Sequence, residues 1–175
     1  MATVLTTTYD SVANSNALTI TLASLATSSS LLVGQQSATV DNASTKYLDV
    51  ILSGQVTIGT TPTAGQINVY VFAPTKVASS VYSWPTATAT ALSTSDASRT
   101  FEAGQLAQLR LAGSASTVAT TDRVYAFEPV SVASLFGGVM PLAWGIFVTH
   151  NTAVNLNATA GNHWFHWTGI TATAT

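Results

Sequence analysis

An alternation of side chains through residues 47–58 constrains the fold more than any other stretch of this sequence. The odd-numbered positions carry one bulky aliphatic residue, Ile51, and the even-numbered positions are bulky and apolar except for Gly54. A period of two places alternate side chains on opposite sides of the backbone, which predicts a strand with one buried face. The glycine in its middle indicates a bulge, or a bend between two sheets. The residues expected on the buried face, besides Gly54, are Leu48, Val50, Leu52, Val56 and Ile58.

Shorter stretches of apolar or alternating residues recur along the chain and predict further strands. They cover residues 17–23, 31–39, 67–73, 106–111, 124–130, 142–149 and 163–170. The turn-like residues 59–65 lie between two of the strands, so an antiparallel hairpin of residues 47–58 with residues 67–73 is the simplest expectation.

The remaining segments are expected to connect these strands. Residues 112–121 are small and predict a loop, and residues 131–136 predict a single helical turn. Residues 77–96 predict a long surface excursion, although the Thr-Ala run within them is also compatible with an edge strand.

About eight strands and no long helix predict an all-β fold. A two-sheet antiparallel sandwich of the jelly-roll type fits this number of strands better than an immunoglobulin-type sandwich. We expect one β-sandwich domain over residues 17–175, because 175 residues suit a single core. The polar, Thr-rich residues 1–16 predict an extended N-terminal arm, which either frays or reaches a neighbouring subunit.

Charge is scarce in this chain, and this limits its partners. Charged residues make up 7% of the sequence, against roughly 25% in an ordinary soluble domain. A surface of low net charge tends to associate, which predicts a subunit covered by neighbours. The five basic residues are scattered, so nucleic-acid binding is not expected, and there is no run of about 18 apolar residues that would enter a membrane.

The candidate catalytic and metal-binding residues do not form a recognisable set. His163 and His166 are three residues apart, a spacing that puts their side chains on opposite faces of a strand, although His150 could neighbour them and keeps a metal site open. The seven acids include no pair that the sequence selects for hydrolysis. We therefore expect no catalytic residue, no metal, no cofactor and no enzymatic activity.

Aromatic and aliphatic side chains outside the expected core predict an interface instead. The candidate interface residues are Ile51, Tyr70, Phe72, Trp84, Trp164 and His166. Tryptophan and tyrosine anchor many protein interfaces, and their rings also stack on sugars. The side chains that could stack on a glycan are Tyr70, Tyr82, Trp84, Trp164 and Trp167.

Several segments resemble a group of small structural virion proteins of tailed bacteriophages. The matching segments are residues 17–25, 40–44, 47–54, 59–65, 140–148, 161–163 and 168–170, whereas the Thr-Ala run of residues 86–91 departs from the pattern. The resemblance implies a non-enzymatic β-sandwich protein of the capsid surface, of the decoration or cement type. It would contact the major capsid protein and copies of itself, for instance as a trimer. The alternatives are a receptor- or carbohydrate-binding module of a head or tail fibre and, less favoured, a jelly-roll hydrolase.

Overall fold

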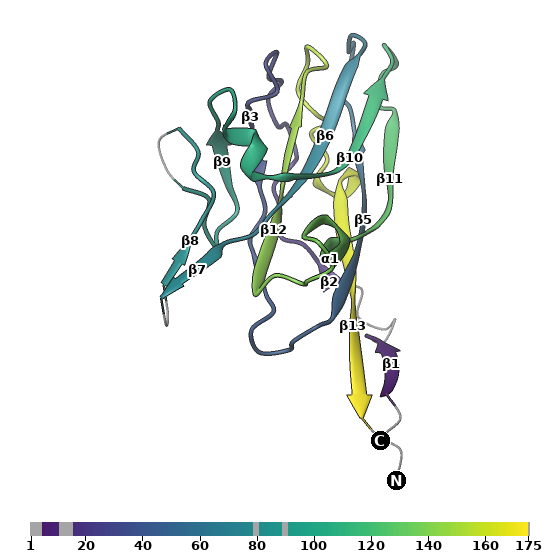
Figure 1. Cartoon of the computed structure of the whole chain (residues 1–175). Helices are drawn as coiled ribbons and strands as arrows, with labels where there is room; N and C mark the ends of the chain where they lie inside the picture. The colour runs from purple at the N-terminus through teal and green to yellow at the C-terminus, as the bar shows by residue number, and fades with distance from the viewer. Residues whose placement is uncertain (1–4, 11–15, 79–80, 89–90, 175) are drawn as a thin grey trace.

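The computed structural model describes residues 5–10, 16–78, 81–88 and 91–174, and within them the chain is an all-β sandwich of two antiparallel sheets (Figure 1). This confirms the predicted fold class. Thirteen strands are present in the described ranges, and six of them have four residues or fewer. The number exceeds the expected eight because strands this short are too brief to show a period in the sequence.

The first sheet, sheet A, has β13 at its centre. Its strands are β1 (Leu5–Tyr9), β2 (Asn16–Ala17), β5 (Asp49–Thr57), β11 (Val124–Ser131) and β13 (Trp164–Ala174). The order is β1-β13-β5-β11, and β2 pairs with β13 at a different height from β1. β13 is therefore longer than its neighbour β5, and its C-terminal part extends with β1 beyond the body of the sandwich (Figure 1).

The second sheet, sheet B, packs face to face against sheet A. Its strands are β3 (Val33–Gln36), β4 (Val40–Asp41), β6 (Gly65–Phe72), β9 (Ala97–Thr100), β10 (Arg110–Thr117) and β12 (Ala143–His150). The order is β10-β6-β12-β3-β9, and β4 pairs with the beginning of β12. A separate two-stranded ribbon joins β7 (Thr75–Ala78) to β8 (Val81–Ser83).

The strand pairs are nested, which identifies the sandwich as a jelly roll. β2 pairs with β13, β3 with β12, β5 with β11 and β6 with β10, so that the chain forms one long hairpin folded back on itself. The hairpin is rolled up by two further pairings, β13 with β5 and β12 with β6. Eight strands in two four-stranded sheets with this connectivity are the jelly-roll arrangement.

The main core lies between the two sheets and follows the alternation of the strands. β5 contributes Val50, Leu52 and Val56, all at most 2% exposed, and Trp144 and Ile146 of β12 face them from sheet B. Leu48 is the exception to the expected buried face, because β5 begins only at Asp49 and Leu48 is 52% exposed.

The expected hairpin of residues 47–58 with residues 67–73 is wrong, since β5 belongs to sheet A and β6 to sheet B. Both strands have an apolar face, and residues 58–64 carry the chain from one sheet to the other, so that these faces meet in the core. Gly54 is neither a bulge nor a bend: β5 pairs continuously through it with β13. The bulge lies in the neighbouring strand β11, between Phe127 and Val130.

Two strand boundaries also differ from those predicted. Residues 17–23 alternate in burial, with Leu18 and Leu22 in the core, but only Ala17 lies in a strand. Residues 105–108 form a 3-10 helix, η1 (Gln105–Gln108), and β10 instead runs through the small residues expected to form a loop. Small residues lack a clear period, so the sequence pattern could not reveal this strand.

Helices are short in the described chain, and none is long and apolar enough to span a bilayer. The predicted helical turn is present as α1 (Val132–Leu135), and η2 (Ala160–Asn162) precedes β13. Asp49 fixes α1 to β5, because its carboxylate accepts hydrogen bonds from the Ser131 hydroxyl (2.6 Å) and from the Ala133 backbone N–H (2.9 Å). Ser131 is the N-cap of α1, and Asp49 satisfies a further backbone N–H of its first turn.

The segment between β6 and β10 covers the outer side of sheet B and forms a second, smaller core. The segment contributes the buried side chains of Ala87, Leu92, Phe101 and Leu109 to this core, where they pack against Phe72 and Phe147 of the sheet. The predicted surface excursion of residues 77–96 is therefore an added layer over the sheet. Residues 79–80 and 89–90 of the excursion lie outside the described ranges.

Candidate interaction surface

The side of sheet A that faces away from sheet B, here called the outer face, brings three of the predicted interface residues together. Trp164 and His166 of β13 lie on it, and Ile51 of β5 lies beside them. The strand register places His166 opposite Ser53 and Thr168 opposite Ile51, so Ile51 and His166 are diagonal neighbours on one face. The alternation that buries Val50 and Phe165 places these side chains outside.

The outer face presents apolar and aromatic surface. The Trp164 side chain is 39% exposed, and its ring meets the His166 ring edge-on at a centroid distance of 5.1 Å. On β11, Val124 is 50% exposed and Ala126 is also exposed on the same side. Gln55 lies between Trp164 and Ala126 on this face, so the exposed rings and aliphatic side chains alternate with uncharged polar ones. An exposed tryptophan among uncharged side chains is the kind of surface that a protein partner covers.

The other three predicted interface residues lie on sheet B or over it. Phe72 is fully buried in the second core and has no surface to offer a partner. Tyr70 and Trp84 are half-buried and pack against the same cluster, with the Trp84 ring 6.2 Å from the Phe72 ring. The C-terminal half of β6 carries large side chains on both faces because it is covered on both sides, and this pattern resembles an interface when only the sequence is known.

The three histidines do not converge on a metal position. His150 is fully buried, and its Nε2–H donates to the Leu25 carbonyl (3.1 Å). His163 is also buried: its Nδ1 accepts the Thr57 backbone N–H (3.3 Å) and its Nε2–H donates to the Asn157 carbonyl (2.8 Å). His166 lies on the outer face. The described residues include no group of three histidine, aspartate or glutamate side chains that could hold a metal ion.

We expect the two buried histidines to make the protein less stable in mild acid. Burial lowers the pKa of His150 and of His163 below the ordinary value of about 6.5, and the nearby His163 lowers that of His150 further. Below pH 6.5 the unfolded chain therefore takes up protons before the folded chain does, so the free energy of unfolding falls as the pH drops toward the folded pKa values.

Urea unfolding at pH 7.5 and at pH 5.0 measures this effect. Carboxylates also titrate in acid, so the informative quantity is the difference between the wild type and His163→Asn, whose side-chain oxygen can still accept the Thr57 N–H. The variant should lose less stability between the two pH values than the wild type. Equal losses would show that His163 does not contribute.

Five of the seven carboxylates accept hydrogen bonds: Asp41 accepts one from the Ala43 backbone N–H (2.8 Å), and the other four accept them from side chains and hold a loop or a strand in place. In addition to Asp49, these are Asp96, bound by Thr21 and Gln35, Asp122, bound by Asn157 (2.7 Å), and Asp10, bound by Tyr47 (2.7 Å). The Asp10 hydrogen bond raises the pKa of the Tyr47 hydroxyl. These positions are structural, and the carboxylates lie on different elements.

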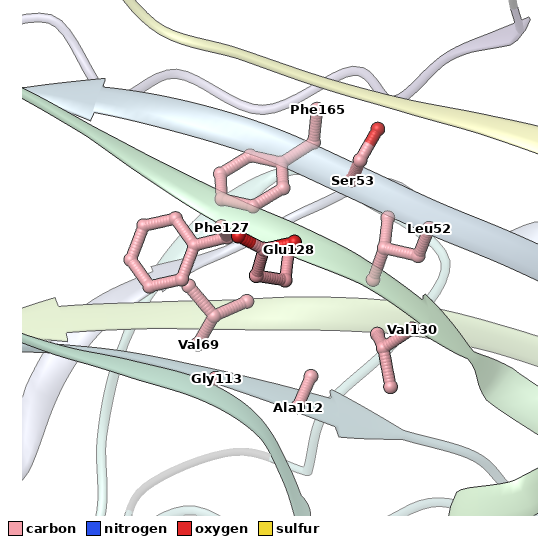
Figure 2. Close-up of a pocket in the computed structure, with 9 residues that line it drawn as sticks. All are labelled: Leu52, Ser53, Val69, Ala112, Gly113, Phe127, Glu128, Val130 and Phe165. Carbon is pink, nitrogen blue, oxygen red and sulfur yellow. The ribbon is translucent and has the colours of Figure 1, made fainter.

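A small cavity lies between the sheets where β10 and β11 both bulge, and Figure 2 shows the side chains around it. The Phe127 and Phe165 rings lie on one side of it, with Leu52 and Val130 nearby. Its volume is about 10 Å³, at the lower limit for one water molecule. It is a packing gap caused by the register shifts in the two strands, too small for a ligand.

A larger, open groove lies at the end of the sandwich opposite β1. Its volume is about 600 Å³, and it is lined by the connections that follow β2, β5, β10 and β12. The lining side chains that carry hydroxyl, amide or carboxylate groups are Ser24, Thr60, Thr61, Asp122, Asn155, Asn157 and Thr159. Ser24, Thr61 and Asp122 also have a positive φ, a backbone conformation that is uncommon for residues other than glycine and often accompanies binding sites.

Sequence reasoning missed this groove and part of the outer face. The groove residues are far apart in the chain, and single threonines and asparagines in loops resemble ordinary turn residues. Val124 and Ala126 belonged to a stretch that was recognised as apolar, but its sequence did not show which of its residues face outward.

The chain matches no protein-family model, no curated protein and no solved structure.

Proposed function

We propose that this chain is a non-enzymatic structural protein of a tailed-bacteriophage virion, at the capsid surface, of the decoration or cement type. The observation that carries the proposal is the outer face of sheet A, where the exposed Trp164 packs against His166 and Ile51 lies diagonal to His166, among the uncharged polar side chains of Ser53, Gln55 and Thr168. Its partners would be the major capsid protein and copies of this chain. The sequence resemblance to small virion proteins points the same way.

The scarcity of charge supports a role in an assembly. Of the seven acids in the chain, Asp10, Asp49, Asp96 and Asp122 accept hydrogen bonds from side chains of the same molecule. These donors are neutral and leave the carboxylates charged, but charged residues make up only 7% of the sequence, so little repulsion keeps neighbouring molecules apart. In a shell of many copies, weak contacts between such surfaces add up through multivalency.

The jelly-roll topology is compatible with the proposal, since this architecture occurs in viral capsid proteins and also in lectins and cupins. A fold shared by several functions does not select one of them. The outer face therefore carries more weight than the fold does.

Copy number per particle tests the proposal. Quantitative mass spectrometry of purified virions should find many copies of this chain for each particle, whereas one to a few copies would contradict a decoration role.

Trp164→Ala should weaken binding to shells that lack the protein by about tenfold or more, because a central aromatic anchor often dominates an interface. Tyr82→Ala, which removes an exposed aromatic ring away from sheet A, is the matched control and should bind normally.

Glycan binding by a fibre module is the second candidate, and the open groove favours it. The groove has a volume of about 600 Å³, and the hydroxyl and amide groups that line it suit a neutral sugar. Glycan-array binding that is lost in Asn155→Ala and kept in Trp164→Ala would place the sugar in the groove. A blank array would count against this function.

A further inference from the structure

The chain has an exposed edge strand whose sequence is complementary to the same strand in a second molecule. This edge belongs to β1, which pairs with the C-terminal part of β13 to form a two-stranded ribbon, here called the terminal ribbon. The ribbon extends beyond the body of the sandwich (Figure 1). All five β1 residues are exposed, and Leu5 and Tyr9 are each 69% exposed.

The two faces of the terminal ribbon differ in polarity. Leu5, Thr7 and Tyr9 share one face with Ile170 and Ala172, as the strand register requires. The opposite face holds threonines from both strands, and the hydroxyls of Thr8 and Thr171 lie 3.1 Å apart. The first face continues the outer face of sheet A, because Ile170 and Ala172 lie on the same side of β13 as Trp164 and His166.

The backbone of β1 has one side free for pairing. Asp10 donates its N–H to the Gly169 carbonyl (2.8 Å), so it points toward β13. Because the N–H and C=O groups of a strand alternate in direction, Thr6 and Thr8 also point toward β13, whereas Leu5, Thr7 and Tyr9 point away from it. The sheet order ends at β1, so within the described chain these outward groups have no strand beside them.

The devices that normally protect an edge strand are missing from this one. Natural edge strands carry lysine, proline or a bulge that prevents pairing with another chain. Residues 5–9 contain no charge and no proline, and their register with β13 is regular. A two-stranded ribbon is also only marginally stable by itself, and three or more strands with an apolar face are far more stable.

We infer that β1 pairs antiparallel with β1 of a second copy of this chain, about a twofold axis at Thr7. The sequence Leu-Thr-Thr-Thr-Tyr is nearly symmetric about its centre, so this register places Leu5 opposite the partner's Tyr9 and Thr6 opposite the partner's Thr8. Thr7 faces its own equivalent, and the two exchange both backbone hydrogen bonds. Each exposed apolar side chain then meets another in a cross-strand pair on one face.

The resulting contact is closed and symmetric. It joins two terminal ribbons into a four-stranded sheet with one apolar face and one threonine face, and it makes the two copies of sheet A continuous. Because no charge lies in the paired strands, the two copies meet without repulsion. A twofold contact uses the same surface on both molecules and stops at two copies.

Cross-linking of the full-length chain tests the register. The sequence contains no cysteine, so Thr7→Cys introduces a single thiol that faces its equivalent at a Cα separation of about 5.5 Å, within the range for a disulfide. We expect Thr7→Cys to form a disulfide-linked dimer at least about tenfold faster than the matched control Thr6→Cys, whose thiol faces position 8 of the partner. Equal rates would overturn the inference.

Association in solution tests the contact independently. Sedimentation of the wild type should show a species of twice 18.1 kDa, and Leu5→Lys or Tyr9→Glu alone should raise its dissociation constant about tenfold or more. The double variant should recover most of the affinity, because an ammonium at position 5 then faces a carboxylate at position 9 of the partner. A wild type that stays monomeric or forms trimers, or single variants that dimerise normally, would contradict the contact.

The partner of the terminal ribbon is therefore a second copy of this chain. This contact adds to the proposed virion role without depending on it. Particle composition tests the virion role, whereas cross-linking and sedimentation test the contact. Either proposal can therefore fail while the other stands.

Discussion

Gly54→Val is expected to prevent this chain from folding at ordinary temperature. Gly54 lies opposite Phe165 in the pairing of β5 with β13, and the Phe165 ring lies across the glycine, where a Cβ atom would overlap it. The ring is 1% exposed and cannot move into solvent without leaving the core. A valine at this position therefore displaces the ring or separates two central strands, at a cost of roughly 4 kcal/mol or more.

Three further variants separate this overlap from a general effect of replacing glycine. Gly161→Val should change the free energy of unfolding by less than about 0.5 kcal/mol, because a Cβ atom at Gly161 meets nothing within 4 Å. Phe165→Leu combined with Gly54→Ala should be more stable than Gly54→Ala with the ring in place. Circular dichroism with urea unfolding measures all of them, and a stable Gly54→Val would show that the ring and the glycine are not packed this way.

Trp144→Ala is expected to cost about 3–5 kcal/mol, the range observed when a large buried aromatic side chain is removed. Trp144 is fully buried on β12 and meets the Trp167 ring edge-on at 6.0 Å, so it connects the two sheets at the middle of the core. Its removal would leave a large cavity between them. Thermal or urea unfolding should show the loss.

Trp144→Phe is the informative companion to this variant. The Trp144 Nε1–H is buried and finds no acceptor among the described residues, which is itself unfavourable. Phenylalanine removes that group and leaves a smaller cavity, so the loss should be less than half of that for alanine. A phenylalanine variant as unstable as the alanine variant would indicate that the indole N–H has a partner, such as a buried water molecule.

The alternation in the sequence predicted the elements of this fold better than their partners. Val50, Leu52 and Val56 were correctly expected in the core because a period of two is a local property of the chain. The alternation could not predict which strand pairs with β5. The turn-like residues 59–65 fit a hairpin as well as they fit the observed crossing between sheets, and the choice depends on contacts with β11 and β13 from the far end of the sequence.

The candidate surface was also predicted only in part, because alternation shows which side chains share a face but not which distant segments cover that face. Trp164 and His166 were both named as candidate interface residues, and the alternation of β13 places them together on the outer face. Phe72 was misjudged because the layer that buries it includes Leu92 and Phe101, whose position over sheet B leaves no pattern near Phe72 itself. The open groove depends on four separate connections, and no local signal marks it.

The nested pairing of the strands has a consequence for how the chain reaches its native state. The innermost of the nested pairs, β6 with β10, already joins residues about 40 positions apart, and the outermost, β2 with β13, joins Ala17 to His166. Long loops must close before these contacts form, which makes such topologies slow to fold. Sheet A has no central strand until β13 has been synthesised, so the nascent chain holds its apolar strands exposed until late. Until each chain is complete, those exposed apolar strands are prone to pair between molecules.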